Sequence, residues 1–516
     1  MSHGPGLSKP AVEVAAPGWL TASIMLATVM QVLDTTIANV ALPHMAASLG
    51  ASQEEITWVL TSYIVASAIA TPLTGWLTDR IGRRTVFLGA IVGFTVASLL
   101  CGIATSLEEM VLFRVLQGIC GAMVVPLAQT VLLDINPRER IGQAMAIYGA
   151  GIMVGPIIGP TLGGWLTESF NWRYVFLINL PLGIIALAGI LVFLPQSATK
   201  ERRFDVFGFA MLALAVGSLQ LLLDRGQAAG WFSSLEIWLY LGLAISGMWV
   251  FVVHCWTARN PFVSLAMFRD RNFSMGLVFI FIIGMTLFSG LALLPPLLQN
   301  LLGYPVVQTG LVMAPRGVGT MISMILVGRL VARFDARLLV CIGILVTAWS
   351  LWLMSGFDVQ MDSRPIILSG VVQGFGLGFV FVPLSTLTFA TIAPQFRGDA
   401  TSFFSLVRNV GSGVGISIVT SVLSRMMTVN HEELASRLTA AAPQVRLQMP
   451  QLLTASPTVA ARVDGLVTQQ AAMIAYIDNF LLMLLLTLAA LPIVLLLRKP
   501  KAAGGAAHAG PAAVAD

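Results

Sequence analysis

The sequence predicts an all-α, polytopic membrane protein with fourteen transmembrane helices. Of its 516 residues, 57% are apolar and only 10% are charged, whereas a soluble domain carries about 25% charged residues. The mean hydropathy of +0.87 indicates more apolar surface than one water-facing core can bury. These values exclude a soluble globular protein and a disordered chain, and they favour helices that cross a bilayer.

Fourteen apolar runs are long enough to cross the hydrocarbon core, which requires about 20 residues of helix. The first run, Trp19 to Pro43, is too long and too uninterrupted for a cleavable signal peptide, so we expect it to be the first span. An even number of spans places both ends of the chain on one side. The runs lie near residues 19–43, 56–77, 85–105, 107–133, 143–166, 174–194, 206–223, 236–256, 273–299, 307–331, 338–357, 365–392, 401–424 and 475–497.

The basic residues predict which side of the membrane each loop faces. Of the 29 Lys and Arg residues, nineteen lie in segments on the side of the termini, seven lie on the opposite side and three lie inside spans. Loops rich in Lys and Arg face the cytoplasm, so we expect a multi-pass protein of the cytoplasmic (inner) membrane with both termini cytoplasmic. Topology therefore explains the net charge of +5, and no nucleic-acid partner is expected.

Two stretches of the chain resemble each other at a separation of 253 to 257 residues, which equals eight spans. The repeat predicts two six-helix halves on either side of two inserted helices, an arrangement typical of alternating-access transporters. The matching residues are Gln117, Gly118, Pro126, Gly155 and Gly159 in the first copy and Gln373, Gly374, Pro383, Gly411 and Gly415 in the second. The predicted units are an N-terminal cytoplasmic tail (1–17), the first half (18–198), a linker with the two extra helices (199–272), the second half (273–497, including an external loop at 425–474) and a cytoplasmic tail (498–516).

Asp34 is the most deeply placed carboxylate, nine residues before the end of span 1 at Pro43. An ionised Asp at such a depth costs roughly 2.5–3.5 kcal/mol and needs a partner, a cavity or a proton. Arg114 enters span 4 to a similar depth, so the two residues form either a structural ion pair or a proton-exchange site. In the repeat Arg114 aligns with Gly370. Because the fold does not require an Arg there, we favour proton coupling by Asp34 and Arg114.

Two further basic residues lie inside spans of the second half, Arg316 in span 10 and Arg408 in span 13. Each is either a structurally satisfied charge or part of a cavity that tolerates amphipathic anions such as hydrophobic weak acids. Flexible Met side chains suit an adaptable apolar lining. The expected substrate-cavity residues are Gln31, Asn39, Gln117, Arg316 and Arg408.

Span 5 carries glycines four residues apart together with two prolines. This spacing leaves one helix face as bare backbone, which allows a neighbouring helix to approach closely, and proline interrupts the helical hydrogen bonds. We expect this face at the interface between the halves; a purely structural kink is the alternative. The residues are Gly151, Gly155, Pro156, Gly159, Pro160, Gly163 and Gly164.

A short charged hairpin connects spans 2 and 3 on the predicted cytoplasmic side. Topological anchoring by basic residues accounts for Arg83 and Arg84 but not for the acidic Asp79. We therefore expect a further role for Asp79 in this hairpin. Its residues are Gly75, Asp79, Arg80, Gly82, Arg83 and Arg84.

Five motifs together identify a family. They are LDTTIANVALP at 33–43, GWLTDRIGRR at 75–84, RVLQG at 114–118 followed by Gly121 and Ala122, the glycines and prolines of span 5, and Asn171, Trp172 and Arg173 followed by Phe176, Asn179 and Pro181. Over nearly its whole length the chain resembles the fourteen-helix drug:proton antiporters of the major facilitator superfamily, EmrB/QacA type.

The resemblance implies the major facilitator fold and multidrug efflux driven by protons, with the span 5 motif as the antiporter signature. In this family the loop between spans 2 and 3 latches the cytoplasmic side while the halves rock, so the resemblance implies a cytoplasmic gate at the charged hairpin of residues 75–84. The resemblance also implies that segment 425–474, in which prolines separate short helix-like pieces, contacts a periplasmic adaptor (membrane fusion) protein that joins an outer-membrane channel. A plain spacer is the alternative.

Several motifs are absent from the sequence. None of the four lysines follows a glycine, so there is no P-loop and no nucleotide is expected. The five histidines are dispersed and form no HExxH motif, so no metal and no catalytic residue is expected. The energy source would be a proton gradient, without a cofactor.

The expected function is a proton-coupled exporter of lipophilic small molecules, a secondary active transporter and not an enzyme. The first alternative is a proton-coupled importer, or a dedicated metabolite or siderophore exporter, on the same fold; the span 5 prolines argue against an importer. The second is an integral membrane enzyme or sensor, which would require a convergent cluster of His, Lys or carboxylate residues that the sequence lacks.

Overall fold

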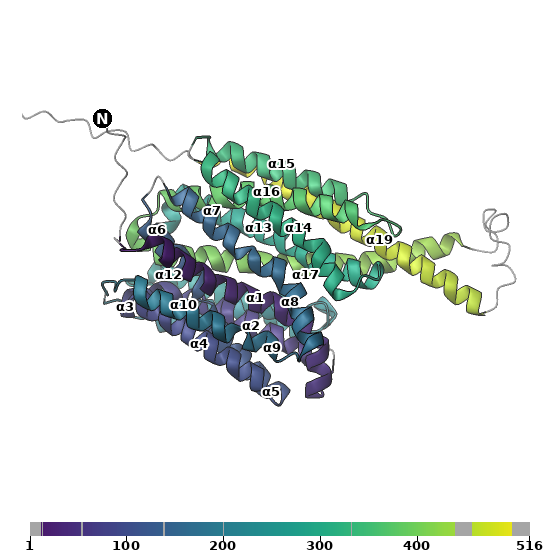
Figure 1. Cartoon of the computed structure of the whole chain (residues 1–516), viewed down its shortest axis with the longest axis horizontal. Helices are drawn as coiled ribbons and strands as arrows, with labels where there is room; N and C mark the ends of the chain where they lie inside the picture. The colour runs from purple at the N-terminus through teal and green to yellow at the C-terminus, as the bar shows by residue number, and fades with distance from the viewer. Residues whose placement is uncertain are drawn as a thin grey trace, which may run out of the picture.

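The computed structural model describes residues 12, 14–52, 55–137, 140–199, 201–331, 333–438 and 457–497. All regular structure in these ranges is helical (Figure 1). Within these ranges thirteen helices are long and apolar enough to cross a membrane, and a fourteenth span is obtained when one bent pair counts as a single span. The predicted all-α polytopic class is confirmed.

The first half contains α1 to α10, and several of its spans consist of two helices. Their bounds are α1 (Pro17–Leu49), α2 (Trp58–Ala70), α3 (Leu73–Ile81), α4 (Arg83–Ile103), α5 (Leu107–Gly121), α6 (Val124–Ile135), α7 (Ile141–Ile152), α8 (Val154–Ser169), α9 (Tyr174–Leu177) and α10 (Asn179–Phe193).

Proline explains where three of these spans break. The pair α2 and α3 is bent by 56° at the step that contains Pro72. The α5/α6 break lies just before Pro126, and the α7/α8 break lies just before Pro156. Because proline has no N–H group, the carbonyl four residues earlier loses its helical partner and the helix ends or bends there.

The inserted pair is α11 (Val206–Arg225) and α12 (Leu235–Thr257). The second half comprises α13 (Arg271–Pro296), α14 (Val306–Leu330), α15 (Ala336–Met354), α16 (Ser363–Ala390), α17 (Arg397–Arg437), α19 (Pro457–Ala489) and α20 (Leu491–Val494). Short 3₁₀ or π turns occur at Glu55–Thr57, Trp231–Ser233, Leu265–Arg269, Leu297–Leu301 and Pro394–Phe396.

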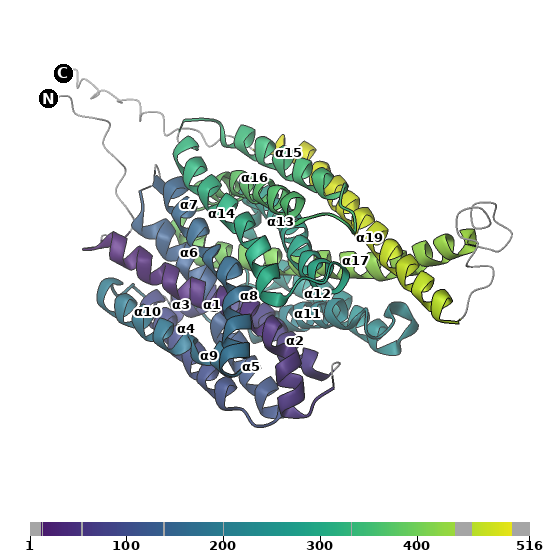
Figure 2. The same ribbon diagram turned by 45° about the vertical axis from the view of Figure 1, so that its right-hand side comes forward.

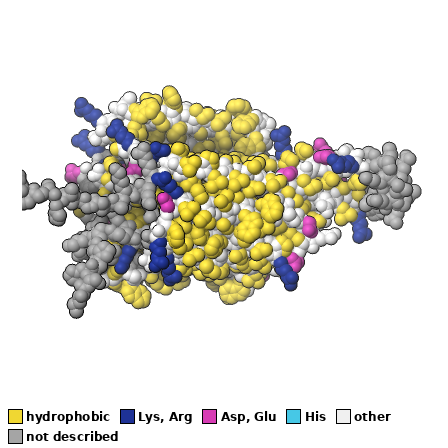
Figure 3. All heavy atoms as spheres, turned by 90° about the horizontal axis from the view of Figure 1, so that it is seen from above, with side chains coloured by type: hydrophobic (Ala, Val, Ile, Leu, Met, Phe, Trp, Pro, Cys, Tyr) yellow, Lys and Arg dark blue, Asp and Glu magenta, His cyan; other side chains and the backbone are white. Residues whose placement is uncertain are grey.

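The helices form two groups that meet along a seam (Figures 1 and 2). Helices α7 and α8 of the first half pack on α14 of the second, and α3 and α6 pack on α17. The inserted α11 packs on α2 and also touches α17, so it contacts both halves. Figure 3 shows apolar side chains over the middle of the molecule and charged side chains toward its two ends, as expected for a bilayer-spanning protein.

The described parts of segment 425–474 are helical extensions of the neighbouring spans. Helix α17 continues without a break to Arg437, and α19 begins at Pro457, one of the three prolines predicted to separate helical pieces. Both helices project beyond the rest of the bundle (Figures 1 and 2). Residues 439–456, which include Pro443 and Pro450, and the tails 1–11 and 498–516 lie outside the described residues.

Candidate functional site

The carboxylate of Asp34 lies in the middle of α1 and is completely buried. Its Oδ2 accepts a hydrogen bond from Nη1 of Arg114 at 2.7 Å. Its Oδ1 accepts one from Nε2 of Gln117 at 2.9 Å and one from Nδ2 of Asn179 at 2.7 Å. Three charged or polar side chains on α5 and α10 thus hold one carboxylate of α1, and the structure brings Asp34, Arg114 and Gln117 together.

Arg114 is also fully buried, and its guanidinium is held on several sides. Nε donates to the carbonyl oxygen of Val59 at 3.0 Å, and Nη1 donates to Oε1 of Gln117 at 2.7 Å. The guanidinium carbon lies 4.3 Å from the ring centroid of Tyr63, a cation–π distance. A buried cation is tolerated only when it is paired and hydrogen-bonded, as it is here.

A second ring of polar groups supports the pair. Asn179 donates to Oγ of Ser98 at 2.9 Å, and Ser98 donates to the carbonyl oxygen of Phe176 at 2.9 Å. Gln31, a predicted cavity residue, donates to the hydroxyl of Tyr63 at 3.0 Å. Sequence reasoning did not select Asn179, Ser98 or Tyr63 as site residues. One signal could have found them: each is a polar residue inside an apolar span. Such a residue is rarely left without a hydrogen-bond partner in a membrane protein.

The remaining predicted cavity residues lie outside this cluster. Asn39 is exposed, and its amide donates to the carbonyl oxygen of Thr35 in its own helix. Arg316 is 6% exposed and donates from Nη2 to the carbonyl oxygen of Leu287 at 3.3 Å. Arg408 is half-buried, and its Nη2 lies 3.4 Å from Oδ1 of Asn409. Among the described residues neither of these two arginines has a carboxylate within ion-pair distance.

The glycines of span 5 pack against α1, the helix that carries Asp34. A Cβ atom at Gly155 would lie 3.0 Å from Val32 and 3.1 Å from the backbone nitrogen of Leu33, so only glycine permits this approach. The other three glycines of the four-residue series face α1 in the same way. They are Gly151 on Met25, Gly159 on Thr36 and Gly163 on Ile37.

The expectation that the span 5 glycine face lies between the halves is therefore wrong for these four residues, because α1 belongs to the same half. The opposite side of α8 faces α14 of the second half. Ile157 packs against Gly317, and Thr161 packs against Gly310. A Cβ atom at Gly164 would lie 3.4 Å from Cγ1 of Val306. Spacing in sequence reveals that a bare face exists, but the tertiary fold decides which helix covers it.

The charged hairpin after span 2 takes part in contacts between the halves. Nη1 of Arg202, in the linker before α11, lies 3.2 Å from Oδ2 of Asp79 and 3.0 Å from Oδ2 of Asp399 at the start of α17. The backbone of Gly75 touches Asp399, which leaves no room for a side chain there. Asp79 and Asp399 thus share one arginine that comes from neither half.

A second ion pair network lies beside the first. Asp134 of α6 pairs with Arg83 and, across the seam, with Nη1 of Arg397 at 2.6 Å. The other predicted gate residues of the hairpin make no hydrogen bond or ion pair across the seam among the described residues. Arg84 donates to the carbonyl oxygen of Leu191 in its own half, and Arg80 is exposed. Gly82 ends α3 with a φ of 87°, a conformation that favours glycine.

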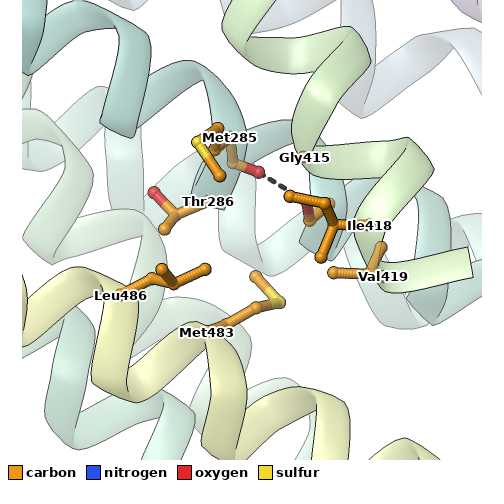
Figure 4. A pocket seen from close by; sticks show the side chains of 8 residues that line it. Met285, Thr286, Gly415, Ile418, Val419, Met483 and Leu486 are labelled. Carbon is orange, nitrogen blue, oxygen red and sulfur yellow. Dashed lines mark hydrogen bonds between the residues drawn. The ribbon is translucent and has the colours of Figure 1, made fainter. Parts of the chain in front are cut away.

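One pocket lies away from these polar clusters, and a second adjoins the ion pair of Arg83 and Asp134. One, of about 10 Å³, is formed by α13, α17 and α19; Ser289 donates to the carbonyl oxygen of Met285 in its wall, and apolar side chains such as Met483 line the rest (Figure 4). This volume is that of about one water. The other, of about 170 Å³, is lined by Arg83, Asp134 and residues 194–198. In the described part of the chain, no three His, Cys, Asp or Glu side chains are placed to hold a metal ion.

Comparisons with known proteins agree with this architecture. The sequence matches the Major Facilitator Superfamily over residues 24–416. It is 36% identical over 436 residues to the multidrug export protein EmrB of Escherichia coli strain K12. This alignment covers 84% of this chain and 85% of that protein. It is 35% identical over 505 residues to the fatty acid resistance protein FarB of Neisseria gonorrhoeae, covering 97% of this chain and 99% of that protein.

Solved structures share the fold. The human organic anion transporter MFSD10 superposes with a TM-score of 0.57 at 17% identity, covering 91% of this chain and 99% of that chain. The proton:xylose symporter XylE superposes with a TM-score of 0.57 at 16% identity, covering 92% and 95%. At these identities the likeness is one of fold alone.

Proposed function

The chain belongs to the major facilitator superfamily, among relatives of the EmrB-type multidrug export proteins, and on that premise we propose that it exports amphipathic, largely hydrophobic compounds in exchange for protons. The predicted family and the predicted class, a transporter and not an enzyme, are confirmed. We place the protein in the cytoplasmic membrane with both termini in the cytoplasm, as the distribution of Lys and Arg favours.

The observation that carries the proton-coupling proposal is the completely buried carboxylate of Asp34, held by Arg114, Gln117 and Asn179. Ionised, Asp34 neutralises the guanidinium. Protonated, it leaves that cation without a counter-charge in a low-dielectric site, which is costly. The two protonation states of Asp34 therefore favour different arrangements of α1 and α5, and an exchanger requires such a difference.

Close packing offers a route from Asp34 to the other half. Gly155 holds α8 against the backbone at Leu33, directly before Asp34 in sequence, and Ile157 on the other side of α8 fills the space at Gly317 of α14. Tightly packed helices cannot absorb a displacement by compression. In our proposal, a shift of α1 on protonation moves α8 and thereby α14.

The shared ion pairs at the predicted cytoplasmic end are the proposed gate. Arg202 bonded to both Asp79 and Asp399, and Asp134 bonded to Arg397, hold the two halves together at that end. Alternating access requires these contacts to break when the transporter opens to the cytoplasm.

The coupling test uses proteoliposomes with an imposed pH gradient and an internal pH indicator. Adding a lipophilic substrate should move protons in the wild type, and Asp34→Asn, which keeps the shape of the side chain, should abolish this movement. Asp478→Asn is the control, since Asp478 is a half-buried carboxylate of α19 outside the Asp34 site, and this variant should retain proton movement. Unchanged proton movement in Asp34→Asn would refute the coupling role. Substrate accumulation on the cytoplasmic face would instead favour the importer.

We also propose that the projecting ends of α17 and α19 form a docking arm for a periplasmic adaptor protein. The two helices are joined beyond the bundle by His431 and Asp464, whose Nε2 and Oδ1 atoms lie 3.0 Å apart, so the arm is a paired unit. Replacing residues 432–463 with a short Gly/Ser linker should abolish adaptor capture in pull-down experiments and leave proteoliposome transport intact. Retained capture would make the arm a spacer.

A further inference from the structure

The second half of the transporter repeats the polar site of the first half without its carboxylate. An offset of 256 residues relates Gln117 to Gln373 and also Gly155 to Gly411. The same offset places Arg114 on Gly370. The packing glycines set the register of α13: Gly159 contacts Thr36, whereas Gly415 contacts Met285. By this register the apolar Ile283 stands where the first half has Asp34.

The second half also has a guanidinium beside the counterpart of Arg114, but it belongs to Arg316 of α14 and not to α16. Arg316 of α14 crosses Gly370, with its Cβ 3.4 Å from the Cβ position of that glycine. A Cβ atom on Gly290 would lie 3.5 Å and 3.6 Å from Nη1 and Nη2 of Arg316 and 3.7 Å from Nε2 of Gln373. An arginine and a glutamine thus converge on Gly290, as Arg114 and Gln117 converge on Asp34.

These groups have unused hydrogen-bonding capacity. Arg316 is 6% exposed and Gln373 is 2% exposed. Nη2 of Arg316 donates to Leu287, but Nη1 of Arg316 and Oε1 of Gln373 have no hydrogen-bond partner among the described residues. A buried guanidinium without a carboxylate is costly, and an ionisable residue inside a membrane span is by default a candidate functional residue.

We propose that Arg316 and Gln373 bind the acidic head group of an amphipathic anion, a carboxylate carried on an apolar body, beside Gly290 of α13. Arg donates two parallel hydrogen bonds to a carboxylate, and these bonds are about twice as strong as neutral ones. The same positive charge repels an amphipathic cation. The inference rests on the proposed export function, because it assigns the substrate class of that pathway.

The test measures binding of two fluorescent probes with the same apolar body, 1-pyrenebutyrate and (1-pyrenebutyl)trimethylammonium, to the full-length protein in lipid nanodiscs. Signal from protein-free discs is subtracted, and no pH gradient is applied. We expect Arg316→Gln to weaken pyrenebutyrate binding about tenfold or more, since hydrogen bonds to charged groups are involved. Binding of the cation should remain equal or increase.

Gly290→Asp provides a second, independent variant. Its Cβ position makes ordinary van der Waals contacts with Arg316 and Gln373, so the new carboxylate lies beside the donors that would bind the probe's head group and competes for them. Gly290→Asp should lose pyrenebutyrate binding, whereas the isosteric, neutral Gly290→Asn should lose much less.

Equal loss of both probes in Arg316→Gln, or equal effects of Gly290→Asp and Gly290→Asn, would overturn the proposal. Because binding is measured without a gradient, a failure of proton coupling in the Asp34→Asn experiment leaves this result unaffected. Conversely, normal proton coupling with no charge preference at Arg316 refutes the anion subsite alone.

Discussion

Nη1 of Arg114 donates a 2.7 Å hydrogen bond to Oδ2 of Asp34, and both side chains are sealed inside the first half of the bundle. The bond joins the middle of α1 to α5, two helices that share few other contacts. The charge state of a single carboxylate therefore decides whether these helices attract each other.

Removing one partner of this pair should be more harmful than removing both. Arg114→Gln leaves the buried carboxyl group of Asp34 without its counter-charge, and the loss in the free energy of unfolding should be about 3–5 kcal/mol. The double variant Asp34→Asn/Arg114→Gln keeps hydrogen-bonding side chains without charge and should recover part of that loss. Thermal unfolding in detergent measures the difference. A double variant less stable than Arg114→Gln alone would show that the pair is not the source of the effect.

The close approach of α8 to α1 should tolerate no side chain at Gly155. Gly155→Ala places a methyl group 3.1 Å from the backbone nitrogen of Leu33, which cannot give way as a side chain can. Overpacking of this kind costs about 1–3 kcal/mol of stability, and proton-coupled transport should decline with it. Gly89→Ala in α4 is the matched control, since its Cβ has open space. If both variants behave alike in unfolding and transport assays, the tight contact has no role.

The sequence predicted the spans and the Asp34–Arg114 site because both have one-dimensional signals, long apolar runs and isolated charges within them. It named Asn179 only as part of a family motif and not as a ligand of Asp34, because that contact arises only when α10 packs beside α1. It also assigned the glycines of span 5 to the wrong neighbour, because a four-residue period defines a face but not its partner. Arg202 escaped attention since it lies among other basic residues, and only the fold brings it between Asp79 and Asp399.

Asp205 should make stability depend on pH at the start of the inserted pair. Burial alone raises its pKa, but the backbone N–H groups of Gly208 and Phe262 and the ring of His254 outweigh burial and hold the pKa below its ordinary value. A lowered carboxyl pKa stabilises the fold above the ordinary Asp value of about 3.9, and this contribution is lost as pH falls through the folded pKa.

The variants separate the charge of Asp205 from its role as the N-terminal cap of α11. Asp205→Ala should cost about 1 kcal/mol through loss of the cap. Asp205→Asn keeps a capping oxygen and should differ from wild type at pH 7 but converge with it below about pH 3.9. Melting curves between pH 3 and pH 7 measure both effects. A wild-type advantage over Asp205→Asn that grows on acidification contradicts the assignment.

Two cysteines introduced across the seam near the predicted cytoplasmic gate should form a cross-link, because two hydroxyl groups already meet there. Oγ1 of Thr130 in α6 lies 2.7 Å from Oγ1 of Thr401 in α17. In a background without native cysteines, Thr130→Cys/Thr401→Cys should form a disulfide under mild oxidation and stop transport, and a reducing agent should restore transport.

The cross-linking yield also tests the role of Arg202. Arg202→Gln removes the bonds to Asp79 and Asp399 and should lower the cross-linking yield, because it shifts the population toward the open state. Arg203→Gln makes the same charge change at an exposed neighbour and should leave the yield unaltered; equal yields in both variants would show that Arg202 does not hold the gate.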